Sequence, residues 1–314
     1  MKKDLTVLFV AREGSKGFFK PVVQNQLSSL MENEKKIRFI SFAIRGKGMK
    51  AYFFSILPLL KLLRKEKPNL VHAHYSFSGI IASLVAFRTP VIVSLMGSDI
   101  EAKNISRLLI LLFSKFSWKA TIVKSNSLKE KMGLEGLWVI PNGVDVNRFL
   151  PRDQEQCKDK LGWDKSKQQL LFLADPNRRE KNFILTQAAY KYLNNSNVEL
   201  KVIYDVESSK IPTYLNAADV VLLSSLWEGS PNIIKEALSC NRPIVSTNVG
   251  DVSHLIAGVD GCFISSSNAN DFADKVVQAL RFQHVKGRER IYALGYDSNS
   301  ISDLIKGLYV QFAK

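Results

Sequence analysis

Two glutamates around a helix start form the pattern in this chain with the clearest chemistry. Residues 224–252 read SSLWEGSPNIIKEALSCNRPIVSTNVGDV, and the apolar run at residues 218–223 before them predicts a buried strand. Ser230 as N-cap and Pro231 at the first helical position then predict a helix through Leu238. The free N–H groups and the positive dipole end of such a helix would bind an anion such as a phosphate.

The spacing of the two carboxylates suits a nucleotide-sugar at this helix start. Glu228 stands just before the helix, and Glu236 lies five residues after Pro231, roughly 7.5 Å along the axis at about 1.5 Å per residue. The two carboxylates therefore flank the same helix start at different depths. A bare Glu-x7-Glu pair is a weak motif, and the alternative is a capped surface helix with two solvated glutamates.

Residues 218–252 closely resemble the donor-site segment of the family 4 retaining glycosyltransferases. The resemblance implies the GT-B fold, an α/β architecture of two Rossmann-like domains whose parallel sheets face each other across a cleft. It also implies that Glu228 contacts the transferred sugar and that Glu236 holds the ribose hydroxyls. The intervening backbone amides, which would face the sugar and the diphosphate, belong to Gly229, Ser230, Pro231, Asn232 and Ile233.

A cationic loop follows the strand predicted at residues 170–174. Arg178, Arg179 and Lys181 would lie at the carboxyl end of this strand, where open α/β sheets bind ligands, and could clamp a diphosphate. In the family an arginine and a lysine of this loop neutralise the leaving diphosphate. The resemblance assigns these roles to Arg178 and Lys181, although Pro176 stands where the family's spacing places the arginine. The alternative is a solvated charged turn.

The first half opens with a predicted strand at residues 5–11, a basic loop with Gly14 and Gly17, and a helix around residues 22–31. The loop resembles the family's N-terminal glycine loop, which meets donor phosphate and acceptor, and this assigns Gly17 to the donor site. Two glycines three residues apart fit an ordinary strand-to-helix turn equally well.

Two residues of the first half stand beside Glu228 as catalytic candidates. His74 closes a His-x-His motif at a predicted strand end, where no third ligand nearby supports a metal site, so we expect a role in the core or in the acceptor cleft. Residues 90–100 resemble the segment in which many family members carry a histidine by the reacting carbon. Met96 holds that place here, which leaves Asp99 and His74.

The length of 314 residues allows two domains, each with a full core. PNGVD at residues 141–145 matches the family's interdomain loop, so we place the boundary at Asn147. The expected domains are residues 1–147 on the acceptor side and residues 148–296 around the donor nucleotide. Residues 297–314 read as a last helix with Ile301 and Leu304 on its apolar face, and in GT-B proteins such a helix returns to the first domain.

The net charge of +15 is almost all in the first half. Residues 1–150 hold 24 Lys and Arg against 10 Asp and Glu, whereas residues 151–314 hold 20 against 19. This asymmetry indicates a polyanionic partner for one domain. Residues 47–67 and 103–120 are apolar and basic, and Lys103 opens the second stretch. They favour an anionic membrane surface, where each cation contributes about 1 kcal/mol; the alternative is two ordinary covering helices with solvated lysines.

The expected location is the cytoplasm, peripheral to the inner face of the cell membrane. The longest apolar runs, at residues 53–63 and 108–113, are shorter than the roughly 20 residues of a spanning helix. Asp4 interrupts the basic and apolar start, which favours a core strand over a signal peptide. An odd number of cysteines, at positions 157, 240 and 262, argues against a disulfide framework.

The resemblance implies a hexosyltransferase that moves a sugar with retention from a nucleoside diphosphate sugar to an acceptor hydroxyl, without metal or cofactor. A basic, amphipathic domain favours a lipid-linked saccharide acceptor in surface polysaccharide synthesis, although soluble acceptors stay open. The alternatives are a sugar-nucleotide epimerase on the same fold, a degenerate transferase that binds donor without turnover, and a basic nucleic-acid-binding protein. No nucleic acid is expected, since no RNA-binding or helix-turn-helix motif is visible.

Overall fold

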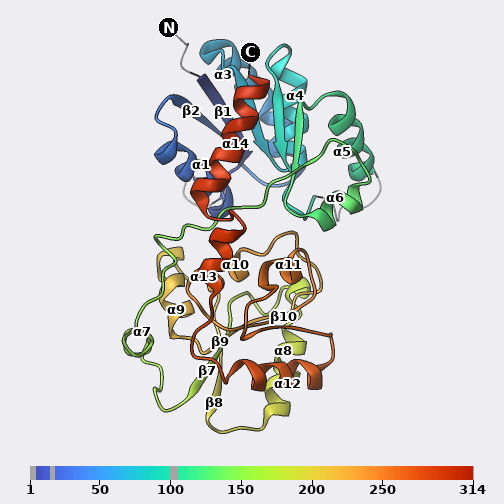
Figure 1. Ribbon diagram of the computed structural model, residues 1–314. Coiled ribbons are helices and arrows are strands. Elements are labelled where there is room, and N and C mark those ends of the chain that lie inside the picture. The colour runs from blue at the N-terminus through green and yellow to red at the C-terminus, as the bar shows by residue number, and fades with distance from the viewer. Residues whose placement is uncertain (1–4, 15–17, 100–104, 314) are drawn as a thin grey trace. The chain divides into compact units, whose positions relative to one another are not determined.

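The protein consists of two compact units, each built around a parallel sheet (Figure 1). The computed structural model describes residues 5–14, 18–99 and 105–313. The first unit comprises Met1–Gly143 and Ser298–Lys314, and the second comprises Val144–Asp297. The sequence placed the corresponding boundaries after Asn147 and Tyr296.

The described sheet of the first unit has strand order β2-β1-β3-β4-β5-β6, with all neighbours parallel. β3, β4 and β5 are buried along their whole length, as short apolar runs in a covered parallel sheet should be. The strands are β1 (Leu5–Arg12), β2 (Ile37–Ile44), β3 (Leu70–His74), β4 (Val91–Ser94), β5 (Ala120–Val123) and β6 (Trp138–Val139).

Helices cover both faces of this sheet. One core forms where α1 and α14 pack side by side on one face (Figure 1), and the other lies under α2, α3, α4 and α5. The helices are α1 (Pro21–Asn33), α2 (Gly48–Phe54), α3 (Ile56–Glu66), α4 (Ser76–Ala86), α5 (Ile105–Phe116), α6 (Asn126–Met132) and α14 (Ser298–Phe312).

The second unit repeats this plan with strand order β11-β10-β9-β7-β8, again parallel throughout. Its strands are β7 (Gln168–Phe172), β8 (Val198–Val202), β9 (Val220–Leu223), β10 (Ile244–Thr247) and β11 (Cys262–Ser265). Its helices are α7 (Gln154–Leu161), α8 (Phe183–Leu193), α9 (Ile211–Ala217), α10 (Asn232–Ser239), α11 (Val252–Ile256), α12 (Ala269–Ala279) and α13 (Gly287–Ala293), with 3₁₀ turns η1 (Arg179–Lys181) and η2 (Ser208–Lys210).

Both sheets reverse their winding at one place. In the first unit β2 and β3 lie on opposite sides of β1, and in the second β8 and β9 lie on opposite sides of β7. Open α/β sheets bind ligands outside the carboxyl ends of the strands at such a reversal, where the loops diverge. The loops after β7 and β9, and after β1 and β3, are therefore the places to look for a site.

Three local expectations need correction. The basic stretch at residues 47–67 forms two helices, because the chain breaks at Ser55, whose hydroxyl donates to the Ala51 carbonyl at 2.7 Å. The sequence also predicts a cap near Asn270 or Asp271 for α12, but Asn268 is the cap, and its side chain accepts from the N–H groups of both residues. Leu304 is 54% exposed, whereas Ile301 and the rest of the apolar face of α14 are buried.

Candidate donor site and the family of the chain

An ion pair joins the loops after two neighbouring strands of the second unit, β7 and β9, where the strand order of the sheet reverses. Lys181, in η1 after β7, donates from Nζ to Oε1 of Glu228, in the loop after β9, at 2.5 Å. Both side chains are mostly buried, at 16% and 17% exposure. Ser225 Oγ donates to the same carboxylate oxygen at 2.8 Å. A cation and a carboxylate expected at the donor are thus held together where a ligand would bind.

Hydrogen bonds between the two loops hold this pair in place. Ser224 Oγ donates to the carbonyls of Lys181 and Asn182 at 2.9 and 3.0 Å. The backbone N–H of Leu226 donates to the Glu180 carbonyl at 2.8 Å. Because these bonds fix the backbone of one loop to the other, Lys181 and Glu228 stay within reach of each other.

α10 begins one residue later than its sequence indicated. Pro231 occupies the N-cap position and Asn232 is the first helical residue, with no side-chain cap. The hydroxyl of Ser230 does not cap the helix, because it donates to Asp251 Oδ2 at 2.7 Å. The fourth and fifth members of the expected set, Asn232 and Ile233, therefore form the first turn of α10, whereas Gly229 and Ser230 lie in the loop before it.

A buried network lies behind this helix start. Lys235 is 1% exposed and donates to Ser230 Oγ at 3.1 Å, and Asp251 is 8% exposed. Burial lowers the pKa of Lys235 to about 8 and raises the pKa of Asp251, and each charge partly offsets the shift of the other. Gly250 lets the loop after β10 lie close to the loop before α10. Its φ is +59°, and a Cβ there would lie 2.6 Å from the Gly229 carbonyl oxygen.

Two buried oxygens around the helix start accept no hydrogen bond from the described residues. They are Oδ1 of Asn232 and Oδ1 of Asp251. Leaving a buried acceptor unpaired costs about 1–3 kcal/mol. Both oxygens belong to residues that adjoin the loop between Glu228 and α10, so hydroxyl groups of a bound sugar are suitable donors for them.

Glu236 lies on α10, one helical turn after Asn232. Burial raises the pKa of its carboxyl to about 7, and the charges of Arg148 and Lys235 oppose that shift. The group is therefore close to half ionised at neutral pH. Its ionised form offers two acceptor oxygens, which suit the hydroxyls of a vicinal diol.

Arg178 lies in the loop after β7 and pairs with Glu180. Its Nε donates to Glu180 Oε1 at 2.8 Å, its Nη2 reaches the same oxygen, and its side chain is 55% exposed. The structure thus brings Lys181, Glu228 and the start of α10 together, and leaves Arg178 in an exposed pair that a ligand would have to displace.

Asp99 is buried in the loop after β4, at the carboxyl edge of the first unit's sheet. Its Oδ1 accepts from the backbone N–H and the hydroxyl of Ser76 at 3.1 and 2.9 Å, and its Oδ2 accepts from the Met96 N–H at 2.8 Å. Burial raises the pKa of Asp99, and these bonds counteract the shift. Asp99 therefore ties the turn after β4 to the start of α4.

His74 is fully buried at the end of β3, and neither ring nitrogen has a hydrogen-bond partner among the described residues. Its ring packs against those of Phe9 and His72. Burial, with the nearby charges of His72 and Lys124, holds its pKa well below the usual value. His74 is therefore neutral at pH 7.

The glycine loop after β1 is only partly described. Gly17 lies outside the described residues. Gly14 is required by the turn, because its N–H donates to the Phe18 carbonyl at 2.7 Å and a Cβ there would lie 2.9 Å from the backbone of Phe19 and Lys20. Lys20 Nζ lies 5.2 Å from the ring centre of Tyr75, the residue after β3.

Family models match both units of the chain. Residues 167–281 match the model of the glycosyl transferases group 1, and residues 21–127 match that of the glycosyl transferase 4-like domain. The chain belongs to the family 4 glycosyltransferases and has their GT-B fold.

Two bacterial glycosyltransferases are similar to this chain in sequence. The UDP-Gal:alpha-D-GlcNAc-diphosphoundecaprenol alpha-1,3-galactosyltransferase of Escherichia coli is 25% identical, over 90% of this chain and 86% of its own length. The putative teichuronic acid biosynthesis glycosyltransferase TuaC of Bacillus subtilis is 26% identical, over 72% of this chain and 64% of its own length.

Solved structures agree with the fold of the glycosyltransferase along its whole length. HepE of Anabaena, in complex with UDP and glucose, superposes with a TM-score of 0.78 at 12% identity, covering 98% of this chain and 100% of its own. Sucrose-phosphate synthase of Thermosynechococcus elongatus has the same TM-score at 13% identity, with 98% of each chain covered. At such identities the likeness shows the fold.

Sequence reasoning did not single out Lys235 and Asp251. A signal for Lys235 was present, since helical spacing puts it on the same face as Leu238 and Ser239, three and four residues later, which are buried. Asp251 carried no such signal, because only the folded loop after β10 brings it to Ser230. Metal-binding geometry is also absent: no three His, Cys, Asp or Glu side chains gather to hold an ion within residues 5–14, 18–99 and 105–313.

Proposed function

We propose that this glycosyltransferase moves a hexosyl group, with retention, from a nucleoside diphosphate sugar to a hydroxyl of a lipid-linked saccharide in surface polysaccharide synthesis. The assignment of the donor site rests on one observation, the Lys181–Glu228 pair beside the start of α10, where the strand order of the second unit's sheet reverses. These groups suit a ligand with a diphosphate next to a sugar.

The reaction requires stabilisation of the charge on the leaving diphosphate and alignment of the acceptor hydroxyl with the anomeric carbon. In the proposed step the bond between the anomeric carbon and the diphosphate oxygen breaks, and the acceptor oxygen bonds to that carbon on the same face. The acceptor proton passes to the departing diphosphate. Lys181 and the free N–H groups at the start of α10 stabilise the negative charge that grows on the diphosphate. Glu228, released from Lys181 by the donor, orients the sugar.

Glu236 completes the donor site in this proposal. Its carboxylate accepts hydrogen bonds from the two ribose hydroxyls, which replace the water that burial removed. Asp99 and His74, the other two candidates, fit supporting roles: Asp99 fixes the loop after β4, and neutral His74 fills the core at the end of β3. No metal or cofactor takes part in this scheme, and activity in excess EDTA tests that point.

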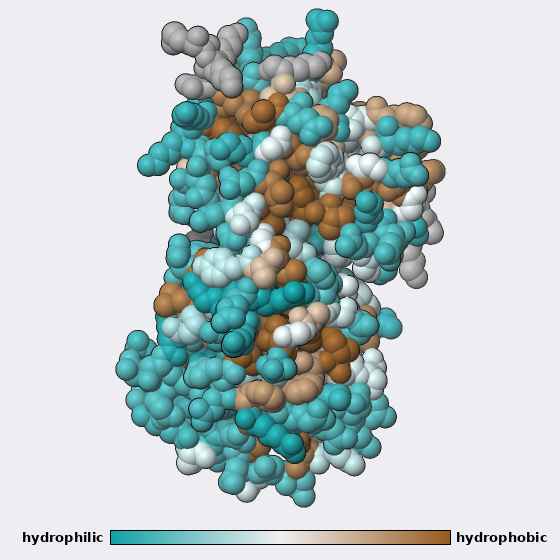
Figure 2. All heavy atoms as spheres, in the orientation of Figure 1, coloured by the Kyte–Doolittle hydropathy of each residue, from teal (hydrophilic) through white to brown (hydrophobic). Residues whose placement is uncertain are grey.

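The acceptor proposal rests on the relatives and on one face of the first unit. The Escherichia coli relative is described as acting on a diphosphoundecaprenol-linked sugar. On α5, Leu108, Leu112 and Phe116 are 57%, 45% and 75% exposed and recur every four residues, which puts them on one stripe. Hydrophobic residues reach the visible face in patches among hydrophilic ones (Figure 2).

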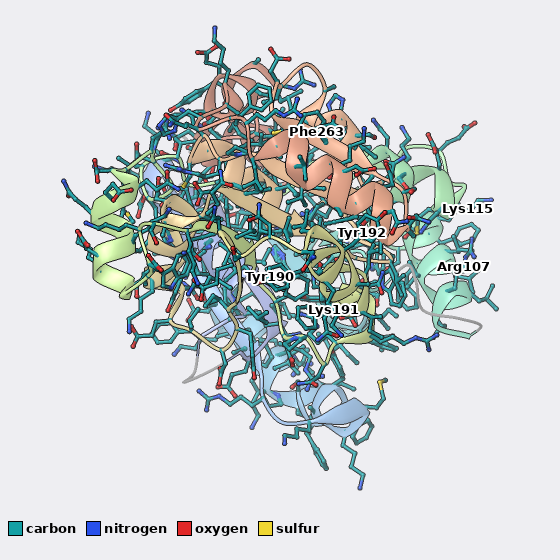
Figure 3. The ribbon with its side chains drawn as sticks, turned by 90° about the horizontal axis from the view of Figure 1, so that it is seen from below. Arg107, Lys115, Tyr190, Lys191, Tyr192 and Phe263 are labelled. Carbon is teal, nitrogen blue, oxygen red and sulfur yellow. The ribbon has the colours of Figure 1, made fainter. Side chains whose placement is uncertain are left out.

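Basic side chains accompany the α5 stripe. Arg107 and Lys115 of α5 are exposed (Figure 3), and the Arg107 guanidinium donates to the Lys131 carbonyl at 2.8 Å. Exposed Lys119 follows the helix, whereas Lys103 lies outside the described residues. An apolar stripe with flanking cations suits the surface of an anionic leaflet. None of the helices in the described part of the chain is both long and apolar enough to span a bilayer. We therefore place the enzyme peripherally, on the cytoplasmic leaflet.

Ligand-dependent thermal stability tests the donor site. UDP, GDP, ADP, CDP and TDP are each added to the native protein and to Glu236→Ala. One nucleotide should raise the melting temperature of the native protein, and the variant should lose that response. A protein that responds to none of the five contradicts the proposal. Release of an epimerised sugar without acceptor would indicate the epimerase reaction instead.

Vesicle flotation tests the membrane face. Leu112→Glu should weaken binding to vesicles that contain anionic lipid by about tenfold, because it puts a charge into the apolar stripe. Val310→Glu is the matched control, since Val310 is 70% exposed on α14. Binding should also fall as salt rises. Equal loss in both variants would contradict a specific role for α5.

A further inference from the structure

A cavity of about 760 Å³ opens beside the edge strand β2 of the first unit. It lies where the sheet ends, so that α1 on one face and α2 and α3 on the other enclose a space that no further strand of the described chain fills. Figure 1 shows β2 next to β1 at the outer edge of this sheet. The volume falls within the range of roughly 300–1,000 Å³ that is usual for ligand pockets.

The wall of the cavity is mostly aromatic and aliphatic. Phe42 of β2 and Leu27 of α1 line it, and three further apolar residues line it while staying largely exposed to water. These are Phe18 at 63%, Met31 at 54% and Phe54 at 72%. Apolar side chains of this size gathered around a hollow suit the apolar part of an amphiphile, while Gln24, Ser41 and Ser55 add polar groups to the same wall.

The charged side of the cavity is cationic. Arg45 is the one charged residue among those described as lining it, and its side chain is 78% exposed. Its nearest partner is Glu13, whose Oε1 lies 3.3 Å from Arg45 Nε. Exposed Lys47 and Lys50 follow Arg45 in the chain. Charge and lining together suit an amphiphile with an apolar chain and an anionic head.

One end of the cavity lies at the carboxyl ends of the strands of this sheet. Phe18 belongs to the loop after β1, and Arg45 directly follows β2. Both are at the carboxyl ends of parallel strands, where open α/β sheets bind their ligands. A head group at Arg45 would therefore lie at the functional edge of the unit, with its chain running between α1 and α2.

We propose that this cavity binds the first isoprenoid units of a polyprenyl diphosphate acceptor, with Arg45 pairing with the diphosphate. This inference rests on the proposed lipid-linked acceptor and assigns it a site distinct from the α5 stripe. The apolar wall holds the chain, and Arg45 exchanges Glu13 for the phosphate oxygens, to which guanidinium binds with two parallel hydrogen bonds.

Binding of geranylgeranyl diphosphate to the whole protein, measured by calorimetry below the micelle concentration, tests the site. Phe54→Asp and Arg45→Gln should each weaken binding at least tenfold, because one removes apolar wall and the other the cation. Two controls should bind like the native protein: Phe87→Asp, since Phe87 is 80% exposed outside the cavity, and Lys181→Met, since Lys181 belongs to the second unit.

Three results would overturn the assignment. They are no binding, equal weakening by Phe87→Asp, and loss of binding only in Lys181→Met, which would put the diphosphate in the donor site. Tighter binding of lysophosphatidic acid than of the isoprenoid would assign the cavity to phospholipid and also overturn it. Nucleotide-induced thermal stabilisation, measured on the same samples, separates the two proposals: if it persists while the isoprenoid fails to bind, only the cavity assignment is lost.

Discussion

At the scale of single residues, Glu236 is a binding-site carboxyl whose burial lowers the stability of the ligand-free protein when the group is ionised. Burial raises the pKa of its carboxyl from 4.5 to about 7. Between these values the unfolded chain is ionised and the folded one is protonated, so the folded state binds more protons and stability falls as pH rises. Above pH 7 the folded protein carries a desolvated charge that a bound ribose would solvate.

We predict that Glu236→Gln stabilises the ligand-free protein at pH 8 by about 2 kcal/mol and has little effect at pH 4.5. The amide has nearly the same shape and never ionises. Thermal melts at the two pH values measure the difference. The same variant should bind the nucleotide more weakly at pH 8. A variant less stable than the native protein at pH 8 would show that the carboxylate is well paired in the folded state.

A second residue-scale prediction concerns the Lys181–Glu228 pair. Lys181→Met should lower kcat on the order of 100-fold, because the cation faces charge that develops only as the diphosphate leaves. Steady-state kinetics with the donor identified by thermal stabilisation would measure it. Arg179→Met is the matched control, since it removes one positive charge from the same 3₁₀ turn. Equal losses of kcat would mean that net charge, not position, matters.

At the scale of elements, the donor turn depends on how closely the loop after β10 approaches the loop before α10. Gly250 permits that contact by two properties: it adopts φ +59°, and it has no Cβ to strike the Gly229 carbonyl. The loop then delivers Asp251 to Ser230. One glycine thereby sets the conformation of the backbone that precedes the helix.

We predict that Gly250→Ala destabilises the protein by about 2–4 kcal/mol and raises the donor KM about tenfold. Gly258→Ala is the control, since Gly258 also has positive φ, +73°, but nothing lies within 4 Å of its added Cβ. That variant should lose only about 1–2 kcal/mol from the backbone conformation and leave KM unchanged. Denaturant unfolding and donor kinetics of both variants check this. Identical effects would contradict a role for the close approach.

At the scale of the whole molecule, the two units differ in how the chain builds them. Among the residues that the structure describes, the cores of the second unit draw only on residues 144–297. One core of the first unit includes Ile301, Ile305, Leu308 and Tyr309 of α14. Tyr309 Oη also lies 2.6 Å from Nδ1 of buried His72. The core of the first unit therefore includes side chains of α14, which follows the second unit in the sequence.

We predict that a fragment of residues 144–297 folds alone and binds the nucleotide, whereas a fragment of residues 1–143 does not fold. The missing α14 would remove four buried side chains at about 1.5–3 kcal/mol each, comparable to the stability of a domain. Circular dichroism and thermal melts of both fragments test this. Adding residues 298–314 as a peptide should restore the first unit. Cooperative melting of 1–143 alone would contradict the prediction.

Much of the fold was predictable from local sequence because parallel strands buried on both faces are short apolar runs. Residues 218–223 contain β9, and the two-domain GT-B fold followed from the family resemblance. The pairing of Lys181 with Glu228 required only that both follow neighbouring strands. The helix start at Ser230 was predicted wrongly, because a local capping preference lost to Asp251 and Lys235, which only folding brings to the hydroxyl.

By itself the sequence determined what adjacent residues settle: the strands, the approximate helices, the excess of positive charge in the first half and the residue types at the donor turn. Tertiary structure decided what depends on contacts between distant segments. Glu236 becomes a weak acid only when packing removes water, His72 meets Tyr309 across 237 positions, and the cavity by β2 exists because the sheet ends there. Desolvation and packing act through space, so no local pattern of residues encodes them.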